Sequence, residues 1–140
     1  MRLSDAGPEG RAIRARLEAA RRRGAVVKTS AAILAEILRG GERDARVHRI
    51  INKIGVTPVS ERIGARAGQL IGAAGLETSE AVDAMVAATA IDHVEEAERS
   101  GRIITALIVT SDVPHLTRLV DGHDRVKIVH VAKFPAPVSL

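Results

Sequence analysis

Three carboxylates lie where solvation alone does not explain them. Glu36 lies in the apolar run AAILAEILRG, Asp83 lies in the alanine-rich run AVDAMVAATA, and Asp112 directly follows the apolar run IITALIV and its TS pair. On a helical wheel, Asp83 falls on the same side as Ile91 and Val94. An unpaired carboxylate on a buried helix face costs several kcal/mol, so Asp83 requires a partner.

These carboxylates are predicted to converge at one edge of a sheet. In open α/β sheets, ligands bind beyond the carboxyl ends of the strands. Carboxylates brought together there repel each other unless one is protonated or a divalent cation lies between them. An all-oxygen ligand set favours Mg²⁺ or Mn²⁺ over zinc. In a basic protein, such a site indicates phosphodiester hydrolysis by metal-activated water.

Each carboxylate also has a purely structural interpretation. Asp112 could cap a helix that begins near Pro114, and Glu36 could lie on an exposed helix edge. Asp83 could complement the helix dipole from the first turn of its helix. The sequence leaves these alternatives open for each residue taken alone.

Composition excludes several other chemistries. The 140 residues contain no cysteine, which excludes disulfides, zinc–thiolate sites and thiol nucleophiles. The five histidines show no HExxH or comparable spacing and are interpreted as surface or hydrogen-bonded residues, and the glycines match neither GxGxxG nor a P-loop. We find no signal peptide and no long apolar run, so we expect a cytoplasmic protein without a membrane partner.

The predicted elements alternate between strand and helix. Strands are expected at AVVK, VTPV, IITALIV and VKIVHV, and IITALIV is apolar on both faces, as in a central strand covered by helices on both sides. The expected N-caps are Ser30, Ser60 and Thr78 or Ser79. Helices are expected over residues 10–23, 31–40, 42–54, 61–71, 80–99 and 114–120.

This alternation predicts a three-layer α/β/α sandwich with a mainly parallel central sheet. We expect a single domain over residues 1–140, with an irregular start at 1–9 and a loose tail at 133–140.

The net charge is +4, and arginines concentrate in GRAIRARLEAARRRG. That helix could attract a phosphate backbone, or it could simply be a solvated helix face.

The blocks AAILAEILRGG, AVDAMVAATA and LIVTSD, in this order, resemble those of PIN-domain proteins, particularly the VapC-like toxins of bacterial toxin–antitoxin modules. The resemblance covers residues 10–131. It implies an α/β/α fold, Mg²⁺- or Mn²⁺-dependent endoribonuclease activity, frequent homodimers and inhibition by a cognate antitoxin. By this resemblance, Glu36, Asp83 and Asp112 match the family's metal-site acids. Thr110 matches the hydroxyl residue two positions before the last of them.

The start of the chain departs from the family pattern. PIN-domain proteins open with a hydrophobic strand ending in the first metal-binding aspartate, whereas this chain begins MRLSDAGPEG. Asp5 in SDAGP resembles that aspartate, but only residues 1–4 precede it, so the opening strand is expected to be missing. Two hypotheses follow. One is a metal-dependent ribonuclease, and the other is a catalytically silent PIN-fold protein that only binds an antitoxin or nucleic acid.

Overall fold

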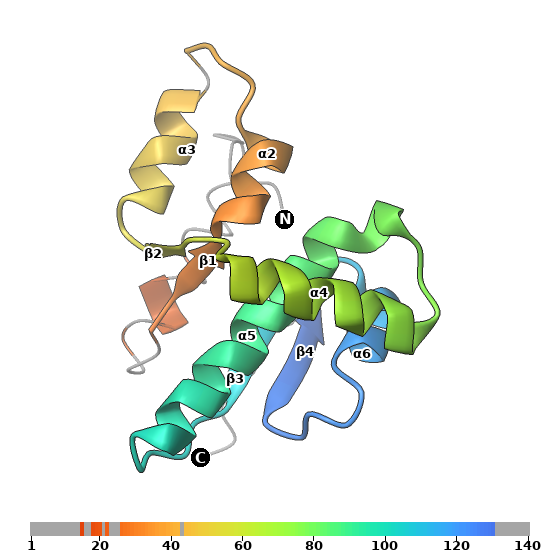
Figure 1. Cartoon of the computed structure of the whole chain (residues 1–140). Helices are drawn as coiled ribbons and strands as arrows, with labels where there is room; N and C mark the ends of the chain where they lie inside the picture. The colour runs from red at the N-terminus through yellow and green to blue at the C-terminus, as the bar shows by residue number, and fades with distance from the viewer. Residues whose placement is uncertain (1–14, 16–17, 21, 23–25, 43, 131–140) are drawn as a thin grey trace. The chain divides into compact units, whose positions relative to one another are not determined.

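Helices and short parallel strands alternate along the chain, as the sequence predicts for an α/β protein (Figure 1). The computed structural model describes residues 15, 18–20, 22, 26–42 and 44–130. It divides into two units, Met1–Pro58 with Lys133–Leu140 and Val59–Ala132, which are described one at a time. The expectation of a single domain stays a prediction.

In the first unit, β1 (Lys28–Ser30) pairs in parallel with β2 (Gly55–Thr57). The segment between them forms η1 (Ala31–Ile33), α2 (Leu34–Ile37) and α3 (Asp44–Ile51). The described residues of the predicted arginine-rich helix are helical. Its other residues, the expected irregular start and the expected loose tail lie outside the described part of the chain.

The helix that carries Glu36 is shorter than the sequence predicts. Ser30 caps the 3₁₀ turn η1 that leads into α2, because its Oγ accepts a hydrogen bond from the N–H of Ala32 at 3.2 Å. α2 then ends at Ile37, since Leu38 has an extended backbone with ψ at 138°. Glu36 itself is exposed, so within this unit its side chain lies on the helix surface.

A buried carboxylate holds the loop that follows α2. Asp44 is 8% exposed and accepts hydrogen bonds from the backbone N–H groups of Gly40 at 2.7 Å and Arg39 at 3.1 Å. Backbone N–H groups in a loop need such partners because they lie outside the hydrogen bonding of a helix or sheet. Asp44 therefore has a structural role in the loop between α2 and α3.

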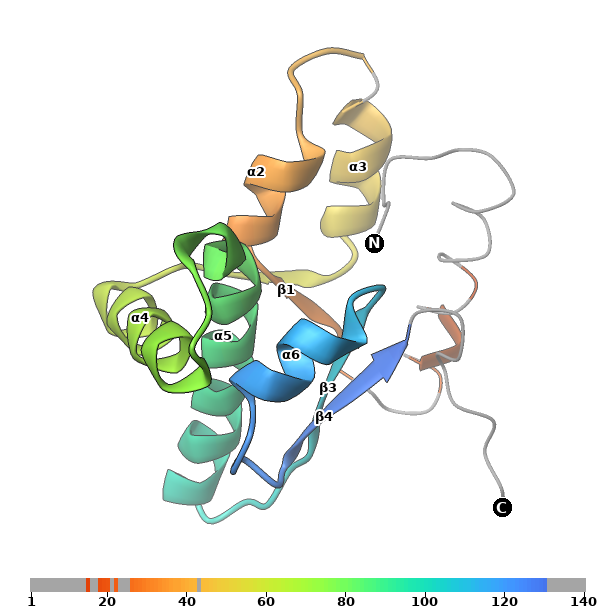
Figure 2. The same ribbon diagram turned by 90° about the vertical axis from the view of Figure 1, so that its right-hand side faces the viewer.

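The second unit packs helices against one parallel strand pair (Figure 2). β3 (Ala106–Thr110) pairs with β4 (Val126–His130), and the segment between them forms α6 (Val113–Leu119). α5 (Ala81–Arg99) contacts β3, α6 and α4 (Glu61–Ala74). The long helix therefore lies at the centre of this unit's packing.

The core of the second unit includes residues from α5, β3 and α6. Ala87 is fully buried, and Ile91 and Val94 are 1% and 6% exposed, so the predicted inner face of the helix is confirmed. Ile108 of β3 and Leu116 of α6 belong to the same cluster. Small alanines on α5 let the neighbouring backbones approach closely, which keeps the interior densely packed.

One face of β3 differs from the prediction. Ile108 is 6% exposed, whereas Leu107 on the opposite face is 52% exposed and Ile103, just before the strand, is 70% exposed. Among the described strands, β3 has β4 as its strand neighbour, and β1 and β2 form a separate pair. The run is apolar on both faces, which predicts a strand buried on both faces. Among the described residues, only the face that carries Ile108 is buried.

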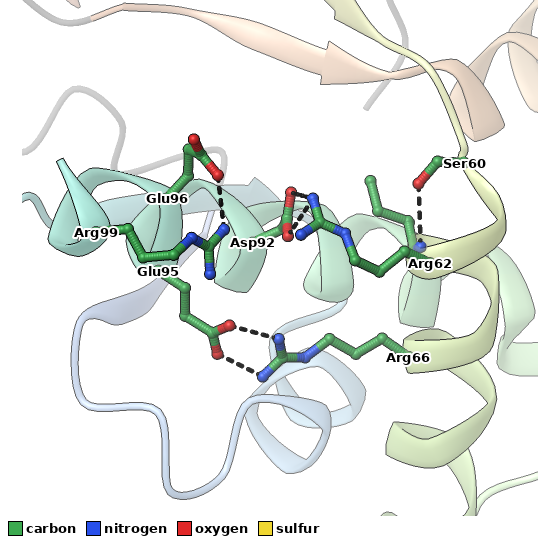
Figure 3. Close-up of polar contacts among 8 residues, drawn as sticks. Ser60, Arg62, Arg66, Asp92, Glu95, Glu96 and Arg99 are labelled. Carbon is green, nitrogen blue, oxygen red and sulfur yellow. Dashed lines mark hydrogen bonds and ion pairs between the residues drawn. The ribbon is translucent and has the colours of Figure 1, made fainter.

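α4 has its predicted start but runs beyond its predicted end at Ile71, to Ala74. Ser60 caps it by accepting a hydrogen bond from the N–H of Ile63 at 3.2 Å (Figure 3). Gly75 ends it in the left-handed conformation, with φ at 65°, which glycine adopts at little steric cost.

Among the described residues, none of the helices combines the length and apolar character needed to cross a membrane.

Ion pairs join α4 to α5 (Figure 3). Arg66 binds Glu95 through two hydrogen bonds, Nη1 to Oε2 at 2.7 Å and Nη2 to Oε1 at 2.6 Å. Arg62 Nη2 lies 2.9 Å from Asp92 Oδ1. Asp92 and Glu95 therefore contact a neighbouring helix, a role that the sequence pattern alone does not reveal.

The Arg66–Glu95 pair is expected to make stability depend on pH. The hydrogen bond from Arg66 lowers the pKa of Glu95 from its ordinary value near 4.5. The stabilisation is therefore present above that value and is lost as the pH falls through the lowered folded-state pKa. We expect Glu95→Gln to reduce the free energy of unfolding at pH 7 by about 0.5–1 kcal/mol, measured by urea denaturation.

The difference between the wild type and Glu95→Gln should shrink steadily as the solution is acidified. Glu98→Gln, at an exposed position on the same helix, is the matched control and should change the free energy of unfolding little. A gap between wild type and Glu95→Gln that stays constant from neutral to acidic pH would contradict this account.

Candidate metal centre

The start of α5 differs from the sequence prediction. Neither Thr78 nor Ser79 caps α5, because both lie in a 3₁₀ turn, η2 (Thr78–Glu80), which continues directly into the helix at Ala81. Such turns are common at helix N-termini. As a result Glu80 lies at the junction of the two helices, three residues before Asp83 and one turn away from it along the chain.

The carboxyl end of β3 presents Asp112. Thr110 is the last residue of the strand and is in register with His130 of β4. Its Oγ1 accepts a hydrogen bond from the backbone N–H of Asp112 at 2.9 Å. Asp112 occupies the N-cap position of α6, yet its side chain makes no capping hydrogen bond. The capping interpretation of Asp112 stays a prediction, because the backbone of His115 in the first turn of α6 still lowers the pKa of the Asp112 carboxyl.

The carboxylate of Asp112 binds a histidine instead. Nδ1 of His115 lies 2.7 Å from Asp112 Oδ2 and 3.8 Å from Glu80 Oε2. One ligand atom from each of the three residues lies within 4.8 Å of the other two. We call this group the Glu80–Asp112–His115 cluster. The side chains of His115, Asp112 and Glu80 are 41%, 45% and 19% exposed, so an ion from solvent can reach them.

The electrostatics of this cluster favour a positive charge at its centre. The hydrogen bond to Asp112 raises the pKa of His115, and the charges of Asp112, Glu80 and Asp83 raise it further. The same hydrogen bond lowers the pKa of Asp112. Asp83 is half-buried in the first turn of α5, and its charge reaches the His115 ring. The surroundings of the ring thus already stabilise a cation.

Of the residues predicted from the sequence, Asp112 belongs to the cluster, and Asp83 is linked to it through its charge. Asp83 and Asp112 both act electrostatically on the His115 ring, and Thr110 contacts Asp112 through the backbone hydrogen bond described above. Glu36 belongs to the first unit, so its place beside them stays a prediction. Asp5 lies outside the described residues, and its part in the site stays a prediction as well.

Sequence reasoning missed two members of the cluster, Glu80 and His115. Asp112 and His115 are three residues apart at the start of a helix, and so are Glu80 and Asp83. Residues at this spacing are neighbours on a helix surface. The D-x-x-H and E-x-x-D spacings were therefore the available signals, although neither spacing shows that the two segments meet.

The donor set fits a divalent cation. Ligand atoms bound at about 2.0–2.2 Å from a metal lie roughly 3–4 Å from one another, by simple geometry. The 3.8 Å from His115 Nδ1 to Glu80 Oε2 lies in this range, whereas the 2.7 Å from Nδ1 to Asp112 Oδ2 is a hydrogen-bond distance that would have to lengthen. Small side-chain rotations would therefore suffice for the three groups to hold one ion.

The sequence profile of the PIN domain matches residues 2–113, which is more than half of the chain. The chain belongs to the PIN-domain family. PIN domains are generally nucleases and bind divalent metals, so this PIN domain has a nuclease-type fold. Asp83 and Asp112 both lie within the matched residues. No match was found among curated proteins or among solved structures.

Proposed function

We propose that this PIN domain is a metal-dependent endoribonuclease that hydrolyses RNA phosphodiesters with water activated by Mg²⁺ or Mn²⁺. The observation that carries the proposal is the meeting of Asp112 with Glu80 and His115 at the carboxyl end of β3, in reach of the charge of Asp83. Parallel strands bring ligands to this end of the sheet. Membership of a family of metal-binding nucleases supports the same chemistry.

Each residue has a defined task in this proposal. Asp83 and Asp112 hold the metal, and Glu36 and Asp5 are proposed as further ligands by the family resemblance. Thr110 fixes the turn that presents Asp112 through its hydrogen bond with the backbone. When bound, the metal supplies a nucleophilic water and stabilises the negative charge that develops on the phosphate.

The proposal extends to the biological role of the protein. We propose a VapC-like toxin of a toxin–antitoxin module that acts in the cytoplasm, forms a homodimer and is inhibited by a cognate antitoxin. The ordered sequence blocks support it. The arginine-rich segment 10–24 is proposed to attract the RNA backbone.

RNA cleavage by the purified protein tests the proposal. We expect cleavage of labelled RNA in Mg²⁺ or Mn²⁺ and none in excess chelator, because the metal supplies the nucleophile. Asp83→Asn keeps the side-chain shape but removes the charge that attracts the ion, so cleavage should fall by about 100-fold or more, because the metal supplies several kcal/mol of transition-state stabilisation. Asp92→Asn, on the same helix but paired with α4, is the control and should keep cleaving.

The outcome also decides between the two hypotheses drawn from the sequence. Varied RNA substrates that stay intact with both ions present would overturn the ribonuclease proposal. If the same protein then bound an antitoxin or nucleic acid, the catalytically silent PIN-fold hypothesis would replace it.

A further inference from the structure

We infer that His115 and Glu80 are metal ligands of this PIN domain, so that its site contains a nitrogen ligand and prefers Mn²⁺ to Mg²⁺. The inference deepens the proposed function and rests on it only for the presence of a divalent metal beside Asp112. Neither residue is among those that the family resemblance carries over, so both would add to the ligands that it implies.

The geometry supplies the first argument. Nδ1 of His115 lies 2.7 Å from Asp112 Oδ2 and 3.8 Å from Glu80 Oε2, so three donor atoms already surround one point. An ion bound to Asp112 there would lie within bonding reach of the ring after only a small rotation of the side chains. Binding would displace the hydrogen that joins Nδ1 to Oδ2, and that proton would be released to solvent.

The packing supplies the second argument. Asp112 and His115 lie one turn apart at the start of α6, whose next residue, Leu116, is 2% exposed and belongs to the core. Glu80 enters from the junction of η2 and α5, and α5 contacts α6. Two helices that pack on one another thus present the three donors, while the donor ends remain open to solvent.

Ligand chemistry decides the metal preference. Mg²⁺ takes oxygen ligands and usually keeps several waters, whereas Mn²⁺, although it also takes mainly oxygen ligands, is the first member of the transition-metal series whose affinity for nitrogen ligands rises toward Cu²⁺. Replacing one oxygen ligand by a ring nitrogen therefore favours Mn²⁺ over Mg²⁺.

A competing interpretation is that His115 only donates a hydrogen bond that orients Asp112, in the way outer partners orient metal ligands. In that case the ring nitrogen would never bind the ion.

Pulsed electron paramagnetic resonance of the Mn²⁺-loaded, tag-free protein separates these interpretations. A ring nitrogen bound to Mn²⁺ modulates the electron spin echo through ¹⁴N coupling, and an outer hydrogen-bond donor does not. We expect this ¹⁴N modulation in the wild type and its loss in His115→Gln. His123→Gln is the matched control, because it removes another histidine of the same unit, and it should keep the modulation.

Calorimetric titration provides a readout for both residues without catalysis. We expect His115→Gln to weaken Mn²⁺ binding by about 10- to 100-fold and Mg²⁺ binding by less, and Glu80→Gln to weaken both. Mn²⁺ binding without ¹⁴N modulation, or with affinity unchanged in His115→Gln, would overturn the inference. The RNA cleavage assay judges the proposed function separately, since a site of oxygen ligands alone would still cleave RNA.

Discussion

Asp112→Asn should abolish metal-dependent RNA cleavage while leaving the fold intact. The asparagine has the shape of the aspartate but lacks the charge that attracts the ion and pairs with His115. We expect the rate of cleavage of labelled RNA to fall by at least about 100-fold. The side chain is 45% exposed and makes no capping hydrogen bond, so the free energy of unfolding should change by less than about 1 kcal/mol.

Asp121→Asn is the matched control for this variant. Asp121 follows α6 in an exposed turn, and its substitution removes the same charge from the same unit outside the cluster. It should leave the cleavage rate within a factor of about two, because screened charges outside the site act weakly. Full cleavage by Asp112→Asn would show that the cluster is not the catalytic site.

Ile91→Ala is expected to lower the stability of the second unit strongly. Ile91 is 1% exposed and packs in the core cluster of the second unit. Truncation removes buried methylene groups and leaves a cavity, which together cost about 2–5 kcal/mol of unfolding free energy. Urea denaturation followed by circular dichroism measures this loss.

Ile103→Ala provides the comparison, since Ile103 is 70% exposed. Its loss should stay within about 0.5 kcal/mol, as for most surface substitutions. Equal losses in the two variants would mean that the packing of α5 on β3 and α6 contributes less to stability than the burial of Ile91 indicates.

Local sequence signals predicted much of the fold. Ser30 and Ser60 were recognisable as caps, since a hydroxyl before an apolar periodic run accepts from an early backbone N–H. The start of β4 at Val126 and the parallel pairing of the strands also follow from apolar runs separated by helical patterns. These features depend on residues that are close in the sequence, which is why one sequence sufficed.

The remaining features depend on contacts between distant residues. Glu80 and His115 are 35 positions apart, and nothing local to either shows that η2 and α6 meet. The partners of Asp92 and Glu95 likewise lie on another helix, α4. The sequence singled out Asp83 and Asp112 because a carboxylate in an apolar setting stands out, and their role as metal ligands stays a prediction. A single histidine such as His115 at the start of α6 does not stand out in this way.

The dependence of the cluster on α6 limits how long the site stays assembled. α6 has 7 residues, and helices this short are not stable in isolation. Leu116 and Leu119, each 2% exposed, anchor it to the core. Each transient detachment of this helix would move Asp112 and His115 apart from Glu80 and release the ion. The lifetime of the assembled metal site therefore cannot exceed the lifetime of the docked helix, which amide hydrogen exchange of α6 would report.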